Sequence, residues 1–111
     1  MAWLVREGQV LASLEIASSM RERGKGLLGR DGFEGALLLR PAKSVHTLGM
    51  RFPIDVAFLD GDLRVVRVTT MRPWRLGLPV LSAHAVLEAE AGAFASWALV
   101  AGDTLEVREG S

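Results

Sequence analysis

The sequence contains no cysteine. This absence excludes a disulfide framework, a thiolate nucleophile and a cysteine-ligated metal site. The formal net charge is zero, so the overall charge indicates neither a nucleic-acid partner nor an anionic membrane. Apolar stretches are short, and none approaches the roughly 20 residues that a membrane-spanning helix needs. The amino terminus also lacks the apolar core of a secretory leader. We therefore expect a soluble, cytoplasmic protein. The sequence does not exclude a leader that has been removed.

Several catalytic signatures are missing as well. There is no Gly-x-Ser-x-Gly nucleophile elbow, no phosphate-binding loop and no His-Glu-x-x-His metal pair. His84 and Glu88 share one face of a predicted strand, but at about 3.3 Å per residue they stand too far apart to chelate one metal ion. The sequence therefore predicts neither a bound metal nor a cofactor.

What the chain does contain is a series of short apolar runs separated by glycine and proline turns. Half of its 111 residues are apolar and 23% are charged, which is typical of one globular domain. Two runs on either side of an Asp-Gly-Asp turn predict a β-hairpin. Ser19 and Glu22 match a helix capping box. We predict a single α+β domain over residues 1–111, mostly β, with a compact antiparallel or mixed sheet or a barrel-like one. The predicted elements are strands at 3–5, 9–16, 36–39, 56–59, 63–68, 84–88 and 104–108, and two short helices near 19–28 and 92–99.

The stretch from His46 to residue 60 carries the densest set of chemical groups. A proline at its centre lacks an amide donor and therefore marks the mouth of a buried strand. His46, Met50 and Arg51 precede that strand, and Asp55 lies just inside it. Two interpretations stay open. Asp55 either pins the loop by accepting backbone hydrogen bonds, with Arg51 as its ion-pair partner, or belongs to a binding or catalytic site.

Two further candidates lie outside this stretch. Arg23 is on the predicted first helix, where it either faces solvent or folds back onto Asp55 or a ligand carboxylate. Trp74 lies between two arginines, in a segment that has no acidic residue from 63 through 87. This tryptophan either packs on the core or stacks on a sugar or base beside an anion.

Four motifs spread over residues 10–108 form a recognisable set: Arg23-Gly-Lys-Gly-Leu27 with Arg30, Met50-Arg-Phe-Pro-Ile-Asp55, Leu87-Glu-Ala-Glu-Ala-Gly92 and Gly102-Asp103. Together they resemble the signature of domain-of-unknown-function family 192, a family of small bacterial and archaeal proteins. The resemblance implies a strand at 84–88 and carries no activity. Family members often have aromatic residues where this chain has Thr47-Leu48-Gly49, so the resemblance does not extend to a ligand that stacks there.

Three functional hypotheses follow. The first is a binding module for a polar or anionic small molecule, a saccharide among them, at the loop and strand entrance over 46–55. The second is a protein-interaction or accessory domain that acts through an exposed surface. The third is a hydrolase that uses His46 and Asp55 as an acid–base pair. No nucleic-acid partner is expected, and the sequence indicates no oligomeric state. The candidate ligand-binding residues are His46, Met50, Arg51, Asp55, Arg23 and Trp74.

Overall fold

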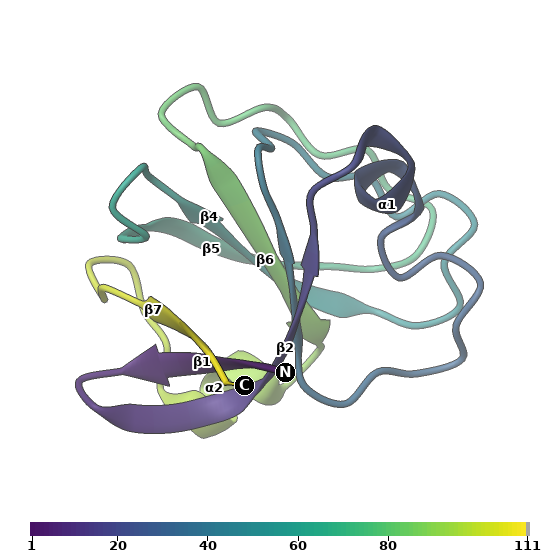
Figure 1. The fold of residues 1–111 in the computed structure, drawn as a ribbon. Helices are drawn as coiled ribbons and strands as arrows, with labels where there is room; N and C mark the ends of the chain where they lie inside the picture. The colour runs from purple at the N-terminus through teal and green to yellow at the C-terminus, as the bar shows by residue number, and fades with distance from the viewer. Residues whose placement is uncertain (111) are drawn as a thin grey trace.

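The computed structural model describes residues 1–110 and arranges them around one sheet of seven strands (Figure 1). Two short helices accompany the sheet. This confirms the prediction of a mostly β, α+β fold with two short helices. In chain order the elements are β1 (Ala2–Arg6), β2 (Gln9–Ala17), α1 (Met20–Lys25), β3 (Ala36–Leu39), β4 (Ile54–Leu59), β5 (Val65–Met71), β6 (Ala85–Glu90), α2 (Ala93–Trp97) and β7 (Glu106–Glu109).

The sheet is mixed, with the strand order β5-β4-β6-β3-β2-β1-β7. Neighbouring strands are antiparallel except β2 and β3, which are parallel because the segment with α1 crosses over between them. The sheet curves until the backbone of Val65, at the start of β5, bonds with Gly102 and Asp103, just before β7. The strands nevertheless do not close into a barrel. Of the predicted sheet forms, the chain therefore adopts the mixed sheet.

Two local predictions are confirmed in detail. In the turn between β4 and β5, Asp60 Oδ1 accepts hydrogen bonds from the backbone N–H groups of Asp62 and Arg64, at 2.9 and 3.0 Å. At the start of α1, Ser19 Oγ accepts from the Glu22 N–H at 3.0 Å, and the Glu22 carboxylate accepts from the Ser19 N–H at 3.1 Å. Both devices satisfy backbone donors within a few residues, which is why the sequence alone reveals them.

An apolar layer lies on each face of the sheet. One layer packs against α2, and the other lies beneath the α1 segment and the long loops. β4 is buried along its whole length because its side chains alternate between the layers. Ala57, for example, enters the α2 layer and Val56 the α1 layer. The two helices therefore cover opposite faces of the sheet. Polar residues that are close in sequence, such as His46 and Asp55, can thus lie on different faces. Within residues 1–110, no helix has the length and apolar character to cross a membrane.

Candidate functional site

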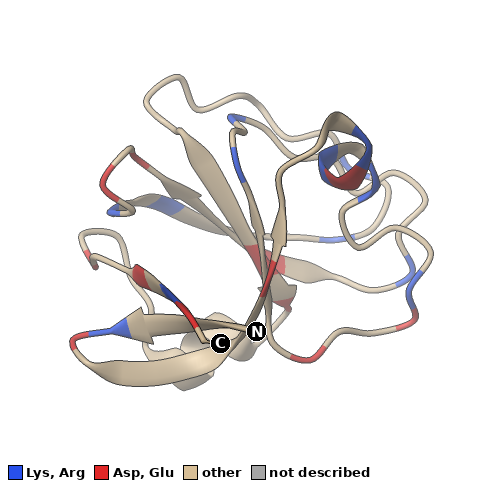
Figure 2. Cartoon of the chain, viewed as in Figure 1, with Lys and Arg blue, Asp and Glu red and all other residues tan. Residues whose placement is uncertain are grey.

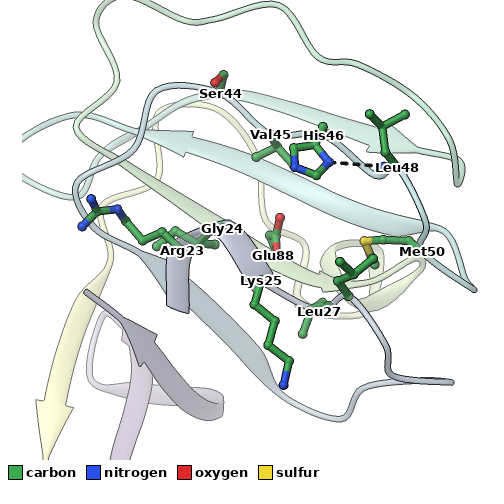
Figure 3. A pocket seen from close by; sticks show the side chains of 13 residues that line it. Arg23, Gly24, Lys25, Leu27, Ser44, Val45, His46, Leu48, Met50 and Glu88 are labelled. Atoms are coloured by element: carbon green, nitrogen blue, oxygen red, sulfur yellow. Dashed lines mark hydrogen bonds between the residues drawn. The ribbon is translucent and has the colours of Figure 1, made fainter. Parts of the chain in front are cut away.

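A cavity of about 110 Å³ lies between the α1 segment, the loop over 44–50 and the central strands (Figure 3). Its walls are largely apolar, from leucines, a valine and a methionine. Polar groups interrupt them, among them the carboxyl of Glu88, the imidazole of His46 and the glycine-rich backbone at the end of α1. The lining residues are Arg23, Gly24, Lys25, Gly26, Leu27, Leu28, Leu39, Ser44, Val45, His46, Leu48, Met50 and Glu88.

Glu88 is the buried polar group of this cavity. It lies on β6, between β3 and β4, with the apolar Leu37 and Val56 as its strand partners. Only 3% of the residue is exposed, and its Oε1 atom has no hydrogen-bond partner among the described residues. Burial raises the pKa of the Glu88 carboxyl from its ordinary 4.5 to about 7. A buried polar atom without a partner is uncommon in proteins, and here it belongs to a carboxyl that lines the cavity.

Gly26 allows the backbone to approach this carboxyl. It ends α1 with a φ of +50°, in the region that side chains disfavour. A Cβ atom built there would lie 3.3 Å from Glu88 Oε1. A side chain at position 26 would therefore crowd the unpaired oxygen, and the glycine leaves the space in front of it open.

His46 and two cationic residues stand around the mouth of the cavity. His46 is exposed, and its Nδ1 accepts a hydrogen bond from the Leu48 N–H at 3.3 Å. The side chains of Arg23 and Lys25 extend away from Glu88 (Figure 3), and Arg23 donates to the backbone carbonyl of Ser18. The floor of the cavity is therefore acidic, while its positive charges lie outside.

The structure brings three of the six predicted site residues to this cavity: Arg23, His46 and Met50. Arg51 lies outside it, where its Nη1 is 2.8 Å from Asp31 Oδ1 in an exposed ion pair. The interpretation that Arg51 pairs with Asp55 is therefore wrong. Trp74 also lies elsewhere, 66% exposed on the long loop after β5.

Asp55 lies on the other face of the sheet from His46, against α2. Its Oδ1 accepts from the Thr70 hydroxyl at 2.8 Å, and its Oδ2 accepts from the N–H groups of Gly92 and Phe94 at 2.9 and 3.1 Å. The residue at the α2 N-cap, Gly92, has no side chain that could do this. Asp55 therefore caps α2 from a distant strand, and the structure does not bring it together with His46.

Sequence reasoning missed two residues of this region. Glu88 was weighed only as a partner for other groups, although an acid in the middle of an otherwise apolar strand (85–89) is a signal of a buried carboxyl. Thr47 carried no signal. It is fully buried, and its Oγ1 donates to the Arg72 carbonyl at 2.6 Å and accepts from the Arg75 N–H at 2.9 Å. Thr47 thus ties the loop beside the cavity to the loop after β5.

Replacing Thr47 by valine should therefore lower the free energy of unfolding by about 1–2 kcal/mol. Valine has nearly the same shape, but it leaves the Arg72 carbonyl and the Arg75 N–H without their hydroxyl partner. Urea denaturation measures the change. Thr69→Val, on β5 with no hydrogen bond from its hydroxyl among the described residues, is the control and should stay within about 0.5 kcal/mol of the parent. Equal stabilities of the two variants would show that the Thr47 tie contributes nothing.

No three His, Asp or Glu side chains in the described part of the chain gather into a group that could hold a metal ion. The chemistry of the cavity is instead that of one buried carboxyl among apolar walls. Such a group can accept a hydrogen bond when ionised and can also donate one when protonated. A pKa of about 7 makes both forms accessible near neutral pH.

Known proteins match this chain over nearly all of its length. A model of domain-of-unknown-function family 192 (DUF192), described as "Uncharacterized ACR", matches residues 3–107. A UPF0127 protein of Pyrococcus horikoshii is 35% identical over 91 residues, which cover 78% of this chain and 76% of the relative. Another from Pyrococcus abyssi is 33% identical over 105 residues, or 90% and 86% of the two chains. A crystal structure of a protein of unknown function from Novosphingobium aromaticivorans superimposes with a TM-score of 0.80 at 25% identity, covering 95% of this chain and 82% of that one.

Proposed function

The chain belongs to domain-of-unknown-function family 192, and from that premise we propose that it is a binding module for a small polar molecule. The ligand occupies the cavity beneath α1 and donates a hydrogen bond to Glu88. The observation that carries this proposal is the buried Oε1 atom, which has no partner among the described residues and belongs to a carboxyl that lines the cavity. A ligand donor would relieve the cost of leaving that atom unpaired.

The size and charge of the cavity narrow the ligand class. Its volume of about 110 Å³ is well below the roughly 300–1,000 Å³ of sites for drug-sized molecules. It therefore suits a small polyol or amine, or one end of a saccharide. A hydroxyl or ammonium group complements the acidic floor. An anion finds less support, because the cationic side chains of Arg23 and Lys25 extend away from the floor (Figure 3).

The hydrolase hypothesis has no observation in its favour. Its two residues face different layers of the protein, and the oxygens of Asp55 already accept three hydrogen bonds. General acid–base catalysis requires both groups within reach of one substrate. We therefore retain the binding hypothesis for His46 and Met50. We assign Asp55 a role in stability.

Thermal melting with panels of polyols, saccharides, primary amines and carboxylates tests the proposal. A ligand that binds only the folded state, at a hundredfold excess over its Kd, stabilises it by about 2.7 kcal/mol. In a domain of this size we therefore expect Tm to rise by several degrees. A hydroxyl- or amine-bearing compound should produce this rise, and a carboxylate should produce less.

Two variants and a matched control locate the effect. Glu88→Gln should reduce the Tm shift, because a neutral amide oxygen accepts a hydrogen bond from a hydroxyl or an ammonium group more weakly than a carboxylate does. His46→Ala should melt like the parent, since His46 is exposed, but should bind more weakly. Glu90→Gln changes a carboxyl on the same strand that does not line the cavity and should respond to ligand like the parent. A panel without any Tm shift, or equal shifts in the parent and Glu88→Gln, would contradict the proposal.

A further inference from the structure

β5 forms one edge of the sheet and leaves part of that edge uncovered. Among the strands of residues 1–110, only β4 pairs with it. At the start of β5 the edge is occupied, because the Val65 N–H donates to Asp103 O and the Gly102 N–H donates to Val65 O. From 66 to 71, within the described residues, no backbone bond other than those to β4 is formed. Alternate N–H and C=O groups of this stretch are thus free to pair with another strand.

A groove of about 490 Å³ is lined by β5, by Phe58 of the neighbouring β4 and by the loop over 72–78. Arg67, Arg72 and Arg75 line it. Leu76 and Leu78 form part of its wall and are 76% and 81% exposed. The groove therefore combines positive charge with apolar surface, next to unpaired backbone groups.

The three groove arginines lack acidic partners within the part of the chain that the structure describes. All four ion pairs found there involve other arginines. The segment from 63 through 87 contains no Asp or Glu, although the whole chain has as many acidic as basic residues. Figure 2 shows the same imbalance: beyond the acidic tip of the β4–β5 hairpin, β5 and the loop that follows are blue and tan. A complementary partner must therefore bring the negative charge.

We propose that β5 and the 72–78 loop are a docking site for an acidic, extended segment of another protein, which adds to the sheet as a strand beside β5. Strand addition uses the free backbone groups for affinity, and alternate side chains for specificity. Arg67 and Thr69 line the groove, and they pair with Phe58 and Val56 of β4, whose side chains lie in one apolar layer. The matching segment alternates acidic residues, which meet the arginines, with apolar ones.

A second copy of the chain does not fit this site. Two β5 edges placed side by side would bring arginines of both copies together, and like charges at close range oppose pairing. The same arginines that discourage self-association select an acidic partner. This inference concerns a groove that shares no lining residue with the Glu88 cavity, and it does not depend on the small-molecule site.

Fluorescence anisotropy with synthetic peptides of about eight residues, the length of a typical strand, provides the test. One labelled peptide alternates glutamate and valine. A second has the same composition with its glutamates in one block and its valines in another. The alternating peptide should bind at least tenfold more tightly at low salt, and its affinity should fall as salt is raised. Absence of binding, or equal binding of the block peptide, would overturn the proposal.

Charge reversal and hydrogen exchange then locate the bound peptide. Arg67→Glu should weaken binding about tenfold or more, whereas Arg21→Glu, an exposed arginine on α1, should leave it unchanged. Backbone amides over 66–71 should exchange more slowly with peptide bound. Binding without that protection would disprove strand addition. Tighter binding of a single-stranded oligonucleotide of equal charge, or of phosphatidylserine vesicles, would assign the groove to another partner class and reject an acidic peptide.

Discussion

Asp55→Asn should lower the free energy of unfolding by about 3 kcal/mol, a large fraction of the stability of a domain of this size. The parent carboxylate accepts three hydrogen bonds, from one hydroxyl and two backbone N–H groups. Each hydrogen bond to a charged group contributes about 1.5–3 kcal/mol. Asparagine can keep its oxygen toward Gly92 and Phe94 only by turning its NH₂ group toward the Thr70 hydroxyl, which must then accept. The substitution also removes the negative charge that strengthens the bonds from the two backbone N–H groups.

Urea denaturation at pH 7 measures this loss. Thr70→Val is the matched control, because it removes one of the three bonds and leaves the cap on α2 intact. It should cost about 1.5 kcal/mol, the low end of that range, because Thr70 is exposed. A loss below about 1 kcal/mol for Asp55→Asn would mean that the carboxylate does not hold α2 in place, and Asp55 would return as a candidate for binding.

Glu88→Gln should have the opposite effect at alkaline pH: the variant should be more stable than the parent by up to about 3 kcal/mol at pH 8. Burial raises the pKa of the Glu88 carboxyl in the folded state to about 7, against an ordinary value of 4.5. Each pKa unit corresponds to about 1.4 kcal/mol. Ionising Glu88 in its apolar surroundings therefore costs stability, and glutamine stays neutral at every pH.

The sign of the pH dependence follows from proton binding. Below pH 4.5 both the folded and the unfolded chain carry the proton, so the stability contribution of Glu88 is at its maximum. Between pH 4.5 and about 7 the unfolded chain has lost the proton and the folded one keeps it, so the free energy of unfolding falls as pH rises. Above about 7 the loss is complete. The variant should lack this decline.

Denaturation of parent and variant at several values between pH 4 and pH 8 gives the difference directly, and the other titrating groups cancel in it. Glu90→Gln on the same strand serves as the control. Glu90 is exposed, and glutamine can still accept the hydrogen bond that the Phe33 N–H donates to it, so its variant should follow the parent curve. A difference between Glu88→Gln and parent that does not change with pH would show that Glu88 is solvated and that the floor of the cavity is not buried.

The features that the sequence predicts correctly depend on neighbouring residues. The capping box at Ser19 and Glu22 and the turn at Asp60 are closed by atoms within four positions in the chain. Local patterns of this kind predict structure directly from the sequence. The alternation of short apolar runs likewise indicates a mostly β fold, because each run fills one strand of the sheet.

The roles of the polar residues depend on contacts that sequence patterns do not record. Asp55 finds its amide donors 37 and 39 positions away, at the start of α2. Arg51 pairs with Asp31 and not with Asp55, its near neighbour in the sequence. Glu88 and His46, which line one cavity, are brought together by the order of the strands, because β6 lies between β3 and β4 and the segment with His46 connects these two strands. Long-range topology decides each case. His46, Arg51 and Asp55 are close in sequence, yet they lie in different parts of the molecule.

The most direct test of the central claim, that Glu88 is a buried carboxyl facing a ligand cavity, is a pH titration of its side-chain carboxyl carbon by ¹³C NMR in the intact protein. The structure predicts a midpoint near pH 7, because the apolar walls disfavour the charged form. A midpoint near the ordinary 4.5 would contradict the account, since it would show that water reaches the carboxyl and that Oε1 has no need of a ligand donor.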